Sequence, residues 1–161
     1  MAIELVQASN DPEGILTTPT KPVEDDPSLA KEIYLKLRAG IATNPNLVGL
    51  AANQIGINAS VCLVLIGHEE KKLRWLTMVN PMIIEKGRTL AFDIEGCGSL
   101  RKPKELYYEV ERPTEITVSF LDTSGHKMGV KLHDYSARVA QHEIDHLNGI
   151  LISDHGRLVS D

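Results

Sequence analysis

The segment His142-Glu143-Ile144-Asp145-His146 is the feature that most restricts how this chain can fold. Two histidines four residues apart reach one metal ion together only when the backbone between them is helical. Apolar residues recur at helical spacing from about Ser136 to Gly149, and they predict such a helix. The fold must therefore turn one face of this helix toward a site that supplies the remaining ligands.

The HExxH motif indicates a metal-dependent hydrolase. Neutral imidazoles bind zinc, iron, nickel or copper, and a carboxylate beside a water on that metal can take the proton of the water. The same letters also occur in helices where they are only solvated polar residues, so the motif by itself gives a hypothesis.

A catalytic metal of this kind usually has three protein ligands. The metzincin pattern would place the third at position 152, which is Ile152, and the thermolysin-like pattern needs a glutamate, which does not occur after His146. Asp154, His155 and Asp161 remain in the tail, but a short tail would have to turn back sharply. The third ligand is expected upstream.

The pattern of the whole chain predicts an α+β fold. Prolines make residues 1–27 an extended arm, and apolar residues at every fourth position from Leu29 to Ile41 predict an N-terminal helix of about 15 residues with Ser28 as its N-cap. Strands are expected at residues 60–66, 75–79, 82–86, 116–121 and 127–132, the last two as a hairpin. We expect antiparallel β-sheets packed around the C-terminal helix, in one domain spanning residues 1–161.

Charge and composition narrow the class of protein. The formal net charge of -5 gives no basic field for nucleic acid, so no direct nucleic-acid contact is expected. Two cysteines are too few for a disulfide framework; Cys62 is expected in the core. We expect no signal peptide, no membrane span and a cytoplasmic location, with an organellar one left open.

Three segments in order resemble the signature motifs of the peptide deformylases. GLAANQ at residues 49–54, EGCGS at 95–99 and QHEIDH at 141–146 are similar to the family patterns GxGLAAxQ, EGCLS and QHExDH. The resemblance covers roughly residues 15 to 154. It implies removal of the formyl group from the N-terminal formyl-methionine of nascent polypeptides by a metallohydrolase.

The resemblance also assigns the residues of the site. It implies that Cys97, His142 and His146 bind one divalent metal, Fe²⁺ natively, with Zn²⁺, Ni²⁺ or Co²⁺ also accepted. Glu143 would be the general base and then the acid. The Gln54 side-chain amide and the Gly98 N–H would stabilise the oxyanion.

The same resemblance leads to expectations about the substrate pocket and about the partners of the chain. The methionine side chain needs an apolar pocket near the metal, and the candidate substrate-binding residues by position are Val48, Gly49, Tyr135, Arg138 and Val139. Glu95 and Asp145 are expected to orient the ligand histidines. We expect a monomer that associates at most transiently with the ribosome.

Three positions depart from the family pattern: Leu47, Gly98 and Arg101 stand where a glycine, a leucine and a proline are usual. We expect a freer loop around Gly98 and a reshaped substrate groove at Leu47. Two alternative functions stay open, a zinc endopeptidase of another HExxH class and a metal-binding module that has lost catalysis.

Overall fold

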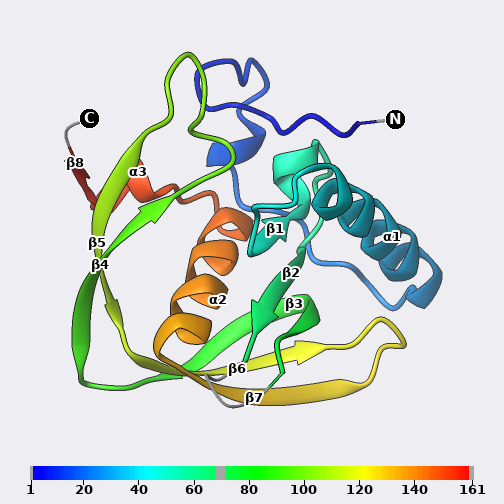
Figure 1. Cartoon of the computed structure of the whole chain (residues 1–161). Helices are drawn as coiled ribbons and strands as arrows, with labels where there is room; N and C mark the ends of the chain where they lie inside the picture. Colours follow the sequence, from blue (N-terminus) through cyan, green and yellow to red (C-terminus); the bar gives the residue numbers. More distant parts are fainter. Residues whose placement is uncertain (1, 68–71, 160–161) are drawn as a thin grey trace.

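The structure is a computed structural model that describes residues 2–67 and 72–159. Two antiparallel sheets surround helix α2 (Asp134–Leu147), and helix α1 (Pro27–Thr43) covers the other side of the larger sheet (Figure 1). This arrangement confirms the expected α+β fold, in which antiparallel sheets pack around the helix that carries HExxH.

The larger sheet has the strand order β1-β2-β3-β6-β7, and the smaller has the order β4-β5-β8. The first comprises β1 (Gly49–Ala51), β2 (Val61–Ile66), β3 (Arg74–Lys86), β6 (Glu115–Leu121) and β7 (Lys127–His133), and the second β4 (Leu90–Gly96), β5 (Tyr107–Pro113) and β8 (Arg157–Val159). Short helices lie at η1 (Ile15–Thr17), η2 (Ala52–Ile55) and α3 (Ile152–His155). The predicted hairpin is confirmed as β6 and β7.

Strand β2 lies between two apolar cores. Cys62, Val64 and Ile66 face α2, whereas Val61 and Leu63 face α1. Because successive side chains of a strand point to opposite faces, a strand with both faces buried needs an unbroken apolar sequence. The run at residues 60–66 therefore predicted this strand correctly, and Cys62 is a core residue as expected.

Two predicted strands are one strand in the structure. The pairing of β3 with β6 shifts register between Val79 and Met82, and Asn80 there has a φ of 51°. The side chain of Asn80 accepts a hydrogen bond from the Val23 N–H and donates one to the Val23 carbonyl. Pro81 has no N–H for the ladder, so the strand accommodates it at a bulge instead of ending there.

The boundaries of both long helices differ from the prediction. Ser28 is not the N-cap of α1: Asp26 is, and its side chain accepts a hydrogen bond from the Leu29 N–H while Pro27 occupies the first turn. Helix α2 begins two residues before Ser136 and ends at Leu147. Gly149 follows with a φ of 75°, which is unfavourable for other residues and stops the helix.

The smaller sheet was not predicted, and its sequence explains why. Leu90, Phe92 and Ile94 of β4 are exposed, and the buried side chain of this strand is Glu95. Strand β5 likewise buries Arg112. The apolar residues of β4 do alternate, but they lie on its exposed face, while the face turned to the protein carries charged residues. This reverses the usual pattern of a half-buried strand, whose apolar face is the buried one.

No helix within the described residues is both long and apolar enough to cross a membrane.

Two leucines of α1 provide a test of the outer core. Leu37 is fully buried and Leu35 is 57% exposed. We expect Leu37→Ala to lower the free energy of unfolding by about 2–5 kcal/mol, because it leaves a cavity beneath the sheet. Leu35→Ala is the control and should change it by less than about 0.5 kcal/mol. Urea denaturation at matched metal content measures both, and equal effects would contradict the packing described.

Candidate active site

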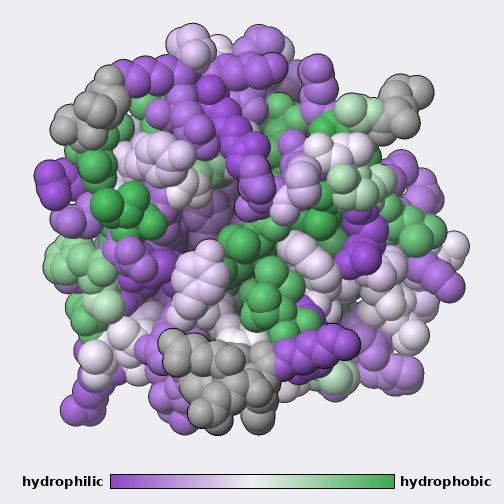
Figure 2. Space-filling model, in the orientation of Figure 1, coloured by the Kyte–Doolittle hydropathy of each residue, from purple (hydrophilic) through white to green (hydrophobic). Residues whose placement is uncertain are grey.

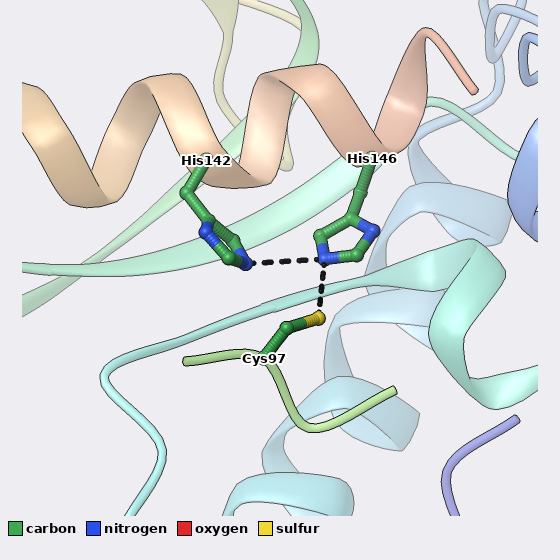
Figure 3. Close-up of side chains that lie close together, drawn as sticks. All are labelled: Cys97, His142 and His146. Carbon is green, nitrogen blue, oxygen red and sulfur yellow. Dashed lines mark hydrogen bonds between the residues drawn. The ribbon is translucent and has the colours of Figure 1, made fainter. Parts of the chain in front are cut away.

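Side chains from α2 and from the loop after β4 converge on one point. His142 and His146 project from the same face of α2 toward Cys97 (Figure 3). Cys97 Sγ lies 3.2 Å from His146 Nε2, which lies 3.2 Å from His142 Nε2. Three donors on one tetrahedral ion are roughly 3.3–3.6 Å apart, given the usual metal–ligand distances. The three side chains could therefore hold one metal ion, with Cys97 as the candidate for the upstream third ligand.

The environment of Cys97 favours the thiolate that a metal needs. Burial on its own would raise the pKa of this thiol, but His146 and His142 outweigh burial and hold the pKa well below its ordinary value. The Ser99 N–H points at the sulfur from 3.4 Å. Cys62 shows the opposite behaviour, because burial and the nearby Glu143 raise its pKa. The two cysteines thus differ as a ligand and a core residue should.

Glu95 fixes the orientation of His142, as expected. Its Oε1 lies 2.9 Å from His142 Nδ1, which leaves Nε2 free to point at Cys97. Two buried guanidinium groups also bind this carboxylate: Arg112 donates at 2.6 and 3.0 Å and Arg138 at 2.6 Å. Although burial opposes ionisation, bonds to His142 and Arg112 hold the pKa of Glu95 far below its ordinary value.

The expectation that Asp145 orients a ligand histidine is wrong. Its carboxylate instead accepts a hydrogen bond from Arg112 at 2.9 Å and lies 3.6 Å from His155 Nε2. His146 Nδ1 is buried and has no hydrogen-bond partner among the described residues. Asp145 therefore supports Arg112, which in turn binds Glu95, and not a ligand histidine directly.

Glu143 is buried against the backbone of β1. A Cβ on Gly49 would lie 2.6 Å from Glu143 Oε1, so only glycine leaves room for this carboxylate. Glu143 Oε2 has no hydrogen-bond partner among the described residues. Burial raises the pKa of Glu143, against the effect of His142 and His146. An unpartnered carboxylate with a raised pKa beside a metal site suits a group that takes up and releases a proton.

Gln54 lies next to the Cys97 loop. Its Oε1 accepts a hydrogen bond from the Ala51 N–H at 3.0 Å, and its Nε2 donates to Ser99 Oγ at 3.2 Å and lies 3.9 Å from Cys97 Sγ. Its side chain is 2% exposed. The amide is thus held in one orientation, with its NH₂ group directed to the metal side.

The packing around Gly98 argues against the expected freer loop. A Cβ at this position would lie 2.5 Å from Leu5 Cδ1 and 3.3 Å from Leu47 Cδ2. These two leucines occupy the space of the missing side chain, so two departures from the family pattern, Leu47 and Gly98, compensate each other. Gly98 is buried, and its carbonyl accepts a hydrogen bond from Gln7.

Most of the predicted site residues border one cavity of about 620 Å³. The surface in Figure 2 is hollowed near the centre of this face, with hydrophilic residues deep in the hollow and apolar side chains beside it. Every predicted site residue except the deeper His146 lines the cavity, namely Val48, Gly49, Gln54, Cys97, Gly98, Tyr135, Arg138, Val139, His142 and Glu143. Arg138 lines it with its guanidinium already bound to Glu95 and to two backbone carbonyls.

The sequence did not single out several residues of the cavity wall. They are Asn46, Ile94, Gly96, Glu105 and Tyr107; Arg101 had been marked only as a departure. Arg101 Nε lies 3.7 Å from Glu105 Oε1. Ile94 and Tyr107 belong to β4 and β5, which were not predicted as strands. Gly96 lies within the EGCGS segment, although no role was assigned to it.

Known proteins match this chain over nearly its whole length. The sequence model of the polypeptide deformylase family matches residues 3–160. A peptide deformylase of Borreliella burgdorferi is 33% identical over 153 residues, which are 95% of this chain and 87% of the relative. One from Limosilactobacillus reuteri is 38% identical over 136 residues, 83% of this chain and 68% of the relative.

Solved structures agree with the sequence matches. A probable peptide deformylase from a Synechococcus phage has a TM-score of 0.82 at 34% identity, covering 96% of this chain and 99% of that one. The class I type b peptide deformylase of Acinetobacter baumannii, bound to Met-Ala-Ser, has a TM-score of 0.81 at 26% identity with the same coverage. The chain therefore belongs to the peptide deformylase family.

Proposed function

We propose that this chain removes the formyl group from N-terminal formyl-methionine with Cys97, His142 and His146 as the metal ligands and Glu143 as the proton carrier. Metal-dependent deformylation is the activity of the family. The observation that carries the residue roles is the convergence of three ligand atoms beside the unpartnered carboxylate of Glu143.

The donor set fits a divalent transition metal. A thiolate with two imidazoles suits Fe²⁺ as well as Zn²⁺, Ni²⁺ or Co²⁺, and we propose Fe²⁺ as the native ion from the family resemblance. Such an ion, when bound, lowers the pKa of water and polarises a carbonyl oxygen. Buried Glu95 keeps His142 in the tautomer that presents Nε2.

Glu143 handles the proton in the hydrolysis. As general base it takes a proton from the attacking water, whose oxygen bonds to the formyl carbon. The bond between that carbon and the methionine nitrogen then breaks, and Glu143 gives the proton to the departing amine. Its Oε2 accepts no hydrogen bond from the described residues, so the carboxylate is available for both steps.

Two donors across the cavity stabilise the negative charge on the formyl oxygen. Gln54 Nε2 is held by the Ala51 contact of its own amide, and the Gly98 N–H belongs to a loop that is packed on its far side. Donors fixed before the reaction need not reorganise when the charge develops, which is the basis of oxyanion stabilisation.

The apolar part of the cavity is the proposed binding site of the methionine side chain. Val48 and Val139 line it beside His142, and Tyr135 is 60% exposed at its mouth. A thioether gains mainly from contact with apolar surface there. The similar enzyme solved with bound Met-Ala-Ser supports a peptide that begins with methionine as the ligand of this cavity.

The two alternative functions have less support. A zinc endopeptidase of another class would need a ligand from the tail, but Asp154 caps the Leu151 N–H at 2.8 Å and His155 lies by Asp145. Asp161 lies outside the described residues. In a metal-binding module without catalysis, nothing would offset the cost of burying the Glu143 carboxylate beside the three proposed ligands.

Replacement of Glu143 tests the proton carrier. Glu143→Gln keeps the size of the side chain but cannot accept a proton, so the rate of formate release from formyl-Met-Ala-Ser should fall roughly 10²–10⁴-fold. The assay uses protein purified anaerobically with Fe²⁺, at equal metal content. Turnover within a few-fold of the wild type would contradict the role of Glu143, and an inactive wild type with a full metal site would contradict the proposed function.

The two buried cysteines give a matched test of the metal ligand. Cys97→Ser replaces a thiolate with a hydroxyl that stays protonated, so the metal-to-protein ratio after dialysis should fall well below one. Cys62→Ala should keep its metal, because Cys62 packs in the core under α2. Elemental analysis measures both. A fully metallated Cys97→Ser protein would favour the endopeptidase alternative.

Gly49 is expected to be required by the position of Glu143. An added Cβ would approach Glu143 Oε1 to 2.6 Å, so Gly49→Ala should displace the carboxylate and lower kcat by about 10²-fold with the metal retained. Gly129→Ala on β7, whose Cβ would come no closer than 3.9 Å to a neighbour, is the control. Equal kcat values for the two variants would show that Glu143 tolerates the shift.

A further inference from the structure

An N-terminal segment, Leu5–Ala8, runs between the two loops that carry the proposed oxyanion donors. The Val6 N–H donates to the Gln54 carbonyl at 2.8 Å, and the Ala8 N–H donates to the Ser99 carbonyl at 2.8 Å. In Figure 1 this segment is the blue trace that passes η2 and reaches the loop between β4 and β5. The segment thus connects the Gln54 turn to the Cys97 loop through its backbone.

The side chain of Gln7 closes the Cys97 loop from behind. Its Nε2 donates to the Gly98 carbonyl at 2.8 Å and to the Leu5 carbonyl at 3.3 Å. Its Oε1 accepts from the Arg101 N–H at 3.0 Å and from the Lys102 N–H at 3.1 Å. One amide therefore holds both ends of residues 98–102.

These contacts determine where the Gly98 N–H points. That N–H belongs to the peptide unit between Cys97 and Gly98, whose carbonyl accepts from the Leu100 N–H at 3.0 Å. The next carbonyl, that of Gly98, is the one held by Gln7. With both carbonyls held and Leu5 packed against the Gly98 Cα, the peptide has little freedom to rotate.

We propose that Gln7 is a positioning residue for deformylation, which aims the Gly98 N–H at the formyl oxygen by holding the Gly98 carbonyl. Leu5 does the same by packing, in place of the side chain that the family carries at this position. The inference rests on the proposed role of Gly98. It assigns a function in the active site to a segment more than 40 residues away in sequence from Gln54 and 90 from Gly98.

Gln7→Glu isolates the bond to the Gly98 carbonyl. It is isosteric and still accepts from Arg101 and Lys102, but it has no N–H for the carbonyl. We expect kcat for formyl-Met-Ala-Ser to fall roughly tenfold with KM and metal content unchanged, because the lost contact acts on charge that develops in the transition state. Gln7→Ala should show at least the same loss. Glu4→Ala, at the exposed position just before this segment, is the control.

Amide hydrogen exchange of the metal-loaded protein gives a readout independent of turnover. Exchange at residues 98–100 should be faster in Gln7→Glu than in the wild type, although none of these N–H groups bonds to Gln7. A kcat within twofold of the wild type, or unchanged exchange at these residues, would overturn the proposal. So would a variant that is only less stable to heat, with kcat per bound metal preserved.

A size exchange tests the packing without relying on Gln7. Gly98→Ala forces a Cβ against Leu5 Cδ1, so kcat should fall, and adding Leu5→Ala should restore most of it. Additive losses in the double variant would overturn the positioning role of Leu5. If the wild type released no formate, the proposed function would be wrong, and the exchange comparison would still decide whether Gln7 holds the loop.

Discussion

The buried carboxylate of Glu95 is the group on which the active site depends. It binds His142 of α2, Arg112 of β5 and Arg138 of α2, and it lies two residues before Cys97, the proposed ligand. A buried ion pair adds little net stability, because both charges lose their hydration. The ion pairs of Glu95 instead restrict how the smaller sheet packs on α2. An arrangement that separates Glu95 from its partners would leave a buried charge without compensation, which is strongly unfavourable. The carboxylate thereby fixes the distance between the cysteine loop and the two histidines.

The rest of the molecule can be understood from this constraint. Helix α2 has one side on the apolar core of the larger sheet and the other on the charged face of the smaller one. Its histidines project toward Cys97, where the loop after β4 begins (Figure 3). Strand β1 and η2 border the same cavity with Gly49 and Gln54. The site lies where layers with separate cores meet. Its reacting groups can therefore be buried while the cavity that leads to them stays open to the substrate.

The departures from the family pattern illustrate how packing preserves a backbone geometry. A glycine in place of leucine at position 98 ought to loosen a loop, because glycine restricts the backbone least. Here Leu5 and Leu47 fill the space from two other segments, and Gln7 holds the carbonyl. The N–H at this position does not depend on the side chain of its own residue. The backbone at position 98 is thus restrained by the segments packed against the loop and not by a side chain of the loop itself.

The sequence by itself determined the helix with HExxH, the double-sided strand β2, the hairpin of β6 and β7, and the three motif segments that make up the site. Each is a local pattern of period, spacing or residue type. The tertiary structure alone decided the smaller sheet, the partner of Asp145, the continuity of β3 through Pro81 and the support of Gly98 by Leu5 and Gln7. These features depend on charges and side chains brought together from distant segments. A carboxylate such as Glu95 looks like a surface residue until the chain has folded around it.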